Sequence, residues 1–147
     1  DKDLAQCVVG DRVVQVDRRS RNIRDESGVR EKFGVGPERI PDWLALVGDA
    51  ADGYPGIAGI GPVSAARLLN RLGPIESFSP DVLGERQEMA LLFKDLATLR
   101  TNAPLFRDVD ELAWKGPVAG FEKWAEKMED PRILARASKL SSREIRS

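Results

Sequence analysis

The chain has 147 residues, with 23 basic and 24 acidic side chains, one cysteine and no histidine. The lack of histidine excludes a Ser-His-Asp triad and imidazole metal ligands, and the single cysteine excludes an internal disulfide and is typical of a reducing compartment. A formal net charge of −1 gives no global positive field, so any binding of a polyanion must come from local geometry.

The first part of the chain predicts a short β edge followed by one helix. It begins abruptly at Asp1-Lys2-Asp3-Leu4, which we interpret as a cut edge, and Cys7 is expected in the core on a strand edge. The β-branched residues of 12–17 predict a strand, and 22–24 can return as a second one. We expect Ser27 to cap a helix that Gly34 ends.

The middle of the chain predicts two helices joined by a long loop. Pro37 is expected to open the first helix, whose residues Ile40, Trp43, Leu44 and Val47 recur at helical spacing. Residues 48–62 are dense in glycine and proline, which indicates a loop with several special backbone angles. The second helix is expected over 62–72, with Gly73 as its end.

The remaining sequence predicts helices only. A short one is expected over 74–78 and a long amphipathic one over 85–100, packed on the preceding helices. Its apolar face is expected to hold Met89, Leu92, Phe93 and Leu96. Two more helices are expected over 117–129 and 131–140, with Trp114 and Trp124 in the core. No apolar run is long enough to span a membrane, so no membrane partner is expected.

Gly59-Ile60-Gly61 stands immediately before the helix expected over 62–72. Glycines let a backbone approach a ligand closely, and the free N–H groups of a helix N-terminus suit a phosphate. A hairpin of this kind can hold a nucleic-acid backbone without reading its bases. The other interpretation is a tight connection between two helices that binds nothing.

Two pairs of aspartates have spacings that place both members on one side of an element. Asp1 and Asp3 share a face if they lie on a strand, and Asp49 and Asp52 share a side of a helical turn. If the pairs converge, their oxygens would hold Mg²⁺ or Mn²⁺, and two such ions assist phosphodiester hydrolysis. Alternatively, the first pair is solvated and the second caps the loop.

Two groups of basic residues allow two interpretations each. One group clusters beside the predicted strand and comprises Arg18, Arg19, Arg21 and Arg24; the other is the basic tail, which comprises Arg132, Arg136, Lys139, Arg143 and Arg146. Either could follow a phosphate backbone, or be a solvated surface screened by salt.

Residues 42–69 resemble the 5′→3′ exonuclease domain of bacterial DNA polymerase I and its stand-alone flap-endonuclease relatives. The resemblance extends to Asp1-Lys2-Asp3-Leu4, to the strand beginning Arg12-Val13-Val14, and to Thr98-Leu99-Arg100-Thr101-Asn102-Ala103-Pro104-Leu105. It covers roughly residues 1–106, in the family's order, and the combination is more specific than any one motif.

The resemblance implies a helix–three-turn–helix motif at about residues 40–73 that binds duplex DNA with a 5′ end or flap. Its DNA-contacting positions would be Gly59, Ile60, Gly61, Pro62, Val63, Ser64 and Arg67. It also implies a K⁺ ion held by the backbone carbonyls of Leu46, Val47, Pro55, Ile57 and Ile60. The divalent metal ligands would be Asp1, Asp3, Asp49 and Asp52, and the reaction would be phosphodiester hydrolysis in the bacterial cytoplasm, at the nucleoid.

The sequence departs from the family pattern at three places. Gly48-Asp49-Ala50-Ala51-Asp52-Gly53 lacks the family's serine and asparagine, which weakens support for Asp52, and Val63 replaces a lysine that would contact phosphate. The family's residues before the Asp-Lys-Asp segment, with further acidic ligands and a helical arch, have no counterpart here. We therefore expect the chain alone not to cleave DNA.

These observations predict a mainly α chain with a short β edge: the C-terminal part of an α/β 5′-nuclease domain with a SAM-like helix-hairpin-helix unit. We expect three regions: 1–36 from the nuclease core, 37–106 as the DNA-binding domain and 107–147 as C-terminal helices. The parent would be a metal-dependent 5′→3′ exonuclease, either joined to a polymerase domain or standing alone. The alternatives are a non-catalytic duplex-DNA-binding module and a helical interaction domain that binds no DNA.

Overall fold

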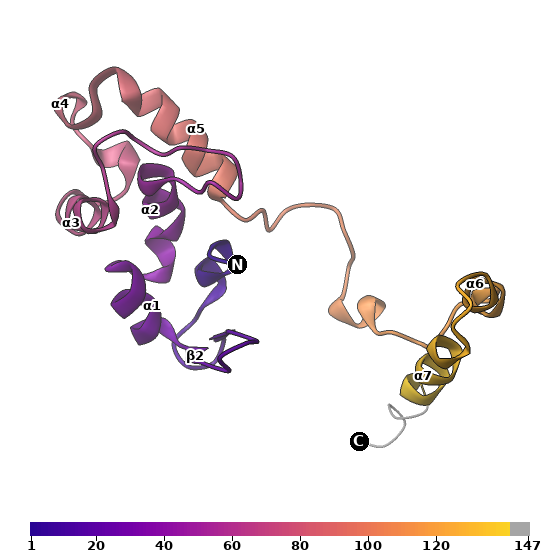
Figure 1. The fold of residues 1–147 in the computed structure, drawn as a ribbon. Helices are drawn as coiled ribbons and strands as arrows, with labels where there is room; N and C mark the ends of the chain where they lie inside the picture. Colours follow the sequence, from indigo (N-terminus) through magenta and orange to yellow (C-terminus); the bar gives the residue numbers. More distant parts are fainter. Residues whose placement is uncertain (142–147) are drawn as a thin grey trace. The chain divides into compact units, whose positions relative to one another are not determined.

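The computed structural model describes residues 1–141 and is mainly helical, with one two-stranded sheet, as the sequence predicts (Figure 1). It separates into two compact units, Asp1–Thr101 and Asn102–Ser147, which are described one by one below. Among the described residues, no helix combines the length and the apolar character needed to cross a bilayer. The division into three regions at residues 36 and 106 stays a prediction.

The N-terminal residues form the 3₁₀ helix η1, Asp3–Cys7, rather than the strand that the sequence predicts. Ala5 points into the core and is fully buried, whereas Cys7 is exposed. The prediction that Cys7 lies in the core was therefore wrong. A 3₁₀ helix turns its side chains by about a third of a turn per residue, so residues two apart do not share a face.

A small antiparallel sheet follows, made of β1, Gln15–Val16, and β2, Ile23–Arg24. Gln15 pairs with Arg24 and Val16 with Ile23, and the Arg24 guanidinium donates to the Gln15 side-chain oxygen over 2.8 Å. The turn between the strands is closed by the Asp17 carboxylate, which accepts from two backbone amides. Both predicted strands are present, although each is only two residues long.

Helix α1, Glu26–Phe33, is capped by Asp25, whose carboxylate accepts from the Gly28 amide over 2.8 Å. The prediction that Ser27 caps this helix was wrong, because Ser27 lies inside the first turn and donates to Asp25 instead. Gly34 ends α1 in the left-handed conformation with φ 73°, which favours glycine. Val29 and Phe33 are its core residues.

Helix α2, Ile40–Val47, is the central element of the first unit. It follows the 3₁₀ turn η2, Pro37–Arg39, so the proline opens that turn rather than the α-helix. Every residue from Ile40 to Leu46 is buried, because α3 and α5 both pack against this helix (Figure 1). Phe33 meets Trp43 edge-on, with ring centroids 5.1 Å apart, and joins α1 to the core.

Helix α3, Pro62–Leu72, has the bounds that the sequence predicts, with Gly73 beyond its last turn. The chain then runs through η3, Ile75–Ser77, α4, Pro80–Leu83, and η4, Gly84–Arg86, into α5, Gln87–Ala97. The short helix predicted over 74–78 is therefore present, α4 was missed, and α5 is shorter than predicted.

Helix α5 buries a different face from the one its large apolar residues predict. Ala90, Phe93 and Ala97 are buried, whereas Met89, Leu92 and Leu96 are at least half exposed. Alanines let α5 approach α2 closely, and this close contact decides which side of the helix faces inward. Of the four residues expected on the buried face, only Phe93 is buried.

The second unit holds η5, Val109–Leu112, α6, Phe121–Lys127, and α7, Pro131–Ser141. Helices α6 and α7 pack on each other, and Ala125 is buried. Trp114 and Trp124 are 44% and 63% exposed, so the prediction that they are core residues was wrong. Of the basic tail, Arg143 and Arg146 lie outside the described residues.

Candidate functional site

The loop after α2 is built by a close contact between two stretches of backbone. Gly48, with φ 88° and ψ 159°, lies against Pro55, and Gly56 lies against Val47. A Cβ on Gly48 would stand 2.5 Å from the Pro55 carbonyl, and one on Gly56 would stand 2.4 Å from the Val47 carbonyl carbon. Such distances allow no side chain, so the two glycines let the loop fold back on the end of α2.

This close approach places Asp49 inside the protein. The Asp49 and Tyr54 backbones form an antiparallel bridge, and the Asp49 carboxylate accepts from the Ala51 amide over 3.1 Å. The Lys2 ammonium lies 2.6 Å from the other Asp49 oxygen, and this hydrogen bond holds the pKa of Asp49 below its ordinary value despite burial. Lys2 was not among the predicted site residues, although it stands between two of them.

Asp3, Asp49 and Asp52 each offer a carboxylate oxygen, and the three oxygens lie within 4.8 Å of one another. One Asp3 oxygen is buried without a hydrogen-bond partner. Burial, and then the negative charges of Asp52 and Asp49, raise the pKa of Asp3 above its ordinary value. The fold thus brings three of the four predicted metal ligands together and leaves one oxygen of the group without a hydrogen-bond partner among the described residues.

Asp1 is not part of this three-carboxylate group. Its side chain is exposed, and its carboxylate accepts from the Asp3 amide over 3.1 Å, at the start of η1. It lines the same open hollow as Asp49 and Asp52. The difference between Asp1 and Asp3 follows from the 3₁₀ turn, because a strand would have pointed both side chains the same way.

Tyr54 adds a feature that the sequence pattern did not single out. Its ring is buried and stacks on Phe93 with centroids 5.5 Å apart, and its hydroxyl is buried without a partner among the described residues. Burial, followed by the charges of Asp3, Asp49 and Asp52, raises the pKa of Tyr54 to about 12. Tyr54 is therefore a neutral hydrogen-bond donor beside the carboxylates at any physiological pH.

The three carboxylates fit a hard divalent cation. They offer oxygen atoms only, which Mg²⁺ and Mn²⁺ prefer, and one Asp3 oxygen is buried without a hydrogen-bond partner among the described residues. An exposed acidic cluster would be a solvated surface, but Asp49 is only 3% exposed. Lys2 already pairs with Asp49 and Asp52 is exposed, so the half-buried Asp3 is the carboxylate whose charge most favours a bound cation.

The predicted DNA-contacting hairpin is exposed between the loop and α3. Gly59, Gly61, Pro62, Val63 and Arg67 are exposed, and Ile60 and Ser64 are half-buried. Ser64 holds the turn, since its hydroxyl accepts from the Gly61 amide and donates to the Gly61 carbonyl over 3.0 Å. Arg86 of η4 also reaches this hairpin and donates to the Ala58 carbonyl over 3.0 Å, a contact that sequence spacing does not reveal.

The five backbone carbonyls predicted to hold K⁺ lie on the two facing stretches of the loop. The Leu46 carbonyl accepts from the Ile57 amide over 2.8 Å, and the Ile57 carbonyl accepts from the Ile60 amide over 3.0 Å. The Val47 and Pro55 carbonyls lie beside the two close-packed glycines. The structure thus brings these segments together.

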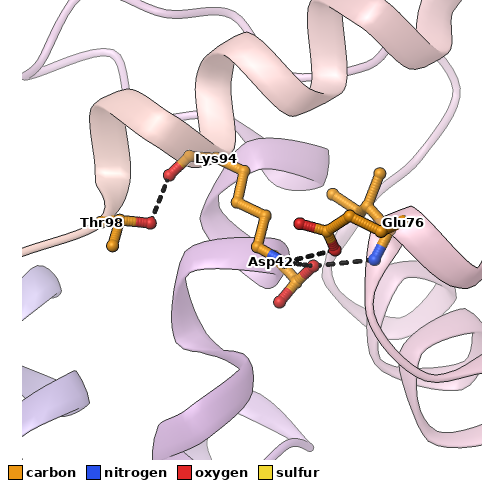
Figure 2. Close-up of polar contacts among 5 residues, drawn as sticks. Asp42, Glu76, Lys94 and Thr98 are labelled. Atoms are coloured by element: carbon orange, nitrogen blue, oxygen red, sulfur yellow. Dashed lines mark hydrogen bonds and ion pairs between the residues drawn. The ribbon is translucent and has the colours of Figure 1, made fainter.

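A buried ion pair fixes α2 against α5. Asp42, which is 1% exposed, accepts from the Ile75 amide and from the Lys94 ammonium, each over 2.8 Å. Figure 2 shows the Lys94 side chain extending from α5 toward Asp42 and Glu76, and its ammonium lies 2.6 Å from a Glu76 oxygen. Because α2 ends at the Gly48–Asp49 turn, this contact holds the helix from which the carboxylate loop begins.

Comparison with known proteins shows similarity to DNA nucleases and polymerases. The sequence profile described as "5'-3' exonuclease, C-terminal SAM fold" matches residues 35–119. The chain is 36% identical to DNA polymerase I of Bacillus caldotenax, over 89% of this chain and 18% of that protein. It is 43% identical to a 5'-3' exonuclease of Aquifex aeolicus, over 52% of this chain and 26% of the relative.

Flap endonuclease Xni of Pectobacterium carotovorum is 36% identical over 57% of this chain and 36% of its own length. Each of these relatives is therefore much longer than the matched region. Among solved structures, T5 5'-exonuclease, described with bound divalent zinc ions, superposes with a TM-score of 0.60 at 18% identity. That superposition covers 66% of this chain and 40% of the T5 protein, and it shows a shared fold.

Proposed function

The chain belongs to the 5′-3′ exonuclease family through its C-terminal SAM fold, and we propose that it binds DNA for metal-dependent phosphodiester hydrolysis at 5′ ends or 5′ flaps. The relatives named as 5'-3' exonuclease and flap endonuclease support this activity. The similarity to DNA polymerase I supports a polymerase domain as a partner in the parent protein. Such a protein would work at the nucleoid, in the bacterial cytoplasm.

One observation carries the proposal: the oxygens of Asp3, Asp49 and Asp52 lie within 4.8 Å of one another at the base of the DNA-binding hairpin's own loop. Aspartates far apart in sequence meet there because η1 packs against α2, and α2 leads directly into the loop that holds Asp49 and Asp52. A purely DNA-binding module gains nothing from three carboxylates that repel both each other and the phosphates.

We assign Asp3, Asp49 and Asp52 as ligands of Mg²⁺ or Mn²⁺. Such an ion, when bound, supplies positive charge that stabilises the phosphate during hydrolysis. Asp3 would contribute its uncompensated oxygen, and Asp49 keeps its charge because Lys2 and the Ala51 amide stabilise the ionised form. The buried Tyr54 hydroxyl has no hydrogen-bond partner among the described residues, and the charges of the three carboxylates help to raise its pKa.

The hairpin would hold the phosphate backbone of duplex DNA. Gly61 has φ −93° and no atom within 4 Å of the place a Cβ would take, so packing within the protein does not require glycine there. A close approach by the backbone of a ligand would require glycine at this position. Arg67 lies nearly two turns further along α3 and would be a second phosphate contact, and K⁺ at the carbonyls of the loop would neutralise charge beneath the hairpin.

The alternative function, DNA binding without catalysis, is the one we propose for the chain when it is separated from its parent protein. The described residues place three carboxylates together, and two divalent ions usually need more ligands than three side chains offer. We propose that this chain of 147 residues binds DNA and a divalent ion without turnover. Cleavage of a 5′-flap duplex by the purified chain with Mg²⁺ would refute this.

Two measurements test the proposed function. Mn²⁺ binding, followed by electron paramagnetic resonance of the free ion, should weaken at least about tenfold in Asp52→Asn and stay unchanged in Asp95→Asn, whose carboxylate pairs with Arg100 on the surface. Equal Mn²⁺ affinity in the wild type and Asp52→Asn would contradict the metal site.

DNA binding is tested at Gly61, where an aspartate is a favoured helix cap and leaves the fold intact. Fluorescence anisotropy with a 5′-flap duplex should show a loss of at least about tenfold for Gly61→Asp, because the carboxylate repels phosphate, and a smaller loss for Gly61→Asn. Unaltered binding by Gly61→Asp would contradict the hairpin contact.

A further inference from the structure

The hollow beside the carboxylates has a second, basic wall. Its lining includes Asp49 and Asp52 and also Lys2, Arg24 and Lys32, which come from the N-terminal segment, β2 and α1. The sequence pattern groups Arg24 with the arginines of the strand turn. The fold separates it from them, because Arg18, Arg19 and Arg21 do not line the hollow.

The three cations are not equally neutralised. Lys2 lies 2.6 Å from Asp49, and Arg24 donates to the neutral Gln15 side chain over 2.8 Å. Lys32 forms no ion pair with any carboxylate of the described residues, and its ammonium lies 4.9 Å from the centre of the Phe33 ring.

The charges around Lys32 leave it with more repulsion than attraction. Burial is the main cause that lowers the pKa of Lys32, and the positive charges of Arg24 and Lys2 lower it further. The negative charge of Asp17 raises this pKa and so acts in the opposite direction. Like charges held together at a cost are stabilised when an anion binds among them. Asp1 and Asp17 also line the hollow, and Asp17 offsets part of the charge of Arg24 and Lys32. The hollow therefore combines carboxylates that suit a divalent cation with a pair of cations, Arg24 and Lys32, that suits an anion.

We propose that Lys32 and Arg24 bind a phosphate group of the DNA strand whose cleavage the carboxylates serve. This assignment rests on the proposed function, because the DNA substrate is the source of the phosphate. That phosphate would lie across the hollow from a divalent cation bound to Asp49 and Asp52. A guanidinium and an ammonium suit this ligand, because phosphate oxygens accept several charge-assisted hydrogen bonds at once. The phosphate is either an internal phosphodiester or a 5′-terminal monophosphate.

The experiment measures the salt dependence of DNA binding by the full chain, with Ca²⁺ in place of Mg²⁺ so that the readout is binding alone. The probes are 5′-flap duplexes that carry either a 5′-phosphate or a 5′-hydroxyl. Lys32→Gln should weaken binding about 3- to 10-fold and reduce the slope of log K against log salt by about 0.7 to 0.9, the value for one phosphate contact. Lys32→Arg should restore most of both.

Arg18→Gln is the matched control, because it removes the same charge from the neighbouring exposed turn and should leave affinity and slope unchanged. Weakening of both probes by Lys32→Gln assigns an internal phosphodiester, and weakening of the 5′-phosphorylated probe alone assigns the terminal phosphate. Wild-type affinity and slope for Lys32→Gln on both probes would overturn the proposal. If Gly61→Asp still weakens binding at least about tenfold in that case, the proposed function stands and only the phosphate contact at Lys32 and Arg24 fails.

Discussion

The buried Asp42–Lys94 pair allows a prediction whose size follows from the structure. Lys94→Met keeps the aliphatic stem that packs between α2 and α5 but leaves the Asp42 carboxylate, 1% exposed, with only the Ile75 amide as a partner. At 2.8 Å the attraction between the charges is about 6 kcal/mol in a medium of effective dielectric about 20. Desolvation of both groups offsets part of it.

We expect Lys94→Met to lower the free energy of unfolding by about 3 kcal/mol, the low end for an unpaired buried charge, because solvent reaches the 19%-exposed Lys94 side chain. Glu76→Gln is the control. It removes the other partner of Lys94, but Glu76 is 55% exposed, so the loss should stay below about 1 kcal/mol. The double variant Asp42→Asn/Lys94→Met should cost less than the sum of the single changes.

Urea denaturation followed by tryptophan fluorescence measures these losses. A Trp114→Phe/Trp124→Phe background leaves Trp43 as the reporter, and it lies in Asp1–Thr101 beside the pair. Both replaced tryptophans belong to the second unit and are 44% and 63% exposed. A loss below about 1 kcal/mol for Lys94→Met, or equal losses for Lys94→Met and Glu76→Gln, would refute the reasoning that burial makes this pair strong.

Three further predictions concern the site. Because the pKa of Asp3 is raised, its ionisation favours unfolding, and the contribution of Asp3 to metal-free stability, measured as wild type against Asp3→Asn, should fall as the pH rises through and above its ordinary value of 3.8. Asp3→Asn should remove that pH dependence, raise the metal-free Tm and weaken Mn²⁺ binding. A metal-free Tm that is lower for Asp3→Asn than for the wild type would argue against a destabilising charge at Asp3. Gly48→Ala should cost more than about 3 kcal/mol in urea denaturation because its Cβ meets the Pro55 carbonyl at 2.5 Å. Gly53→Ala, with φ 83° and open space, should cost only about 1 kcal/mol, and similar losses for both would mean that the close contact does not matter. Val63, 73% exposed, can become lysine without harm to the core, and Val63→Lys should tighten flap-duplex binding with a salt slope steeper by about 0.9; an unchanged slope would place Val63 away from the phosphates.

The sequence alone predicted the features that depend on residues close together along the chain. Helix α3 has its predicted bounds because Pro62 and Gly73 act within one helical turn of each end. Gly48 and Gly56 mark a loop wherever it lies in space, and the combination of four motifs in the family's order was enough to recognise the family.

Only the tertiary structure decided which side chains meet. The 3₁₀ turn of η1 separates the side chains of Asp1 and Asp3. Their spacing of two residues predicts a shared face only on a strand, so it could not show this separation. The buried face of α5 is the alanine side, because close approach to α2 outweighs the hydrophobicity of Met89 and Leu92. The pairing of Asp42 with Lys94 and the basic wall at Lys32 join residues far apart in sequence, so no local pattern contains them.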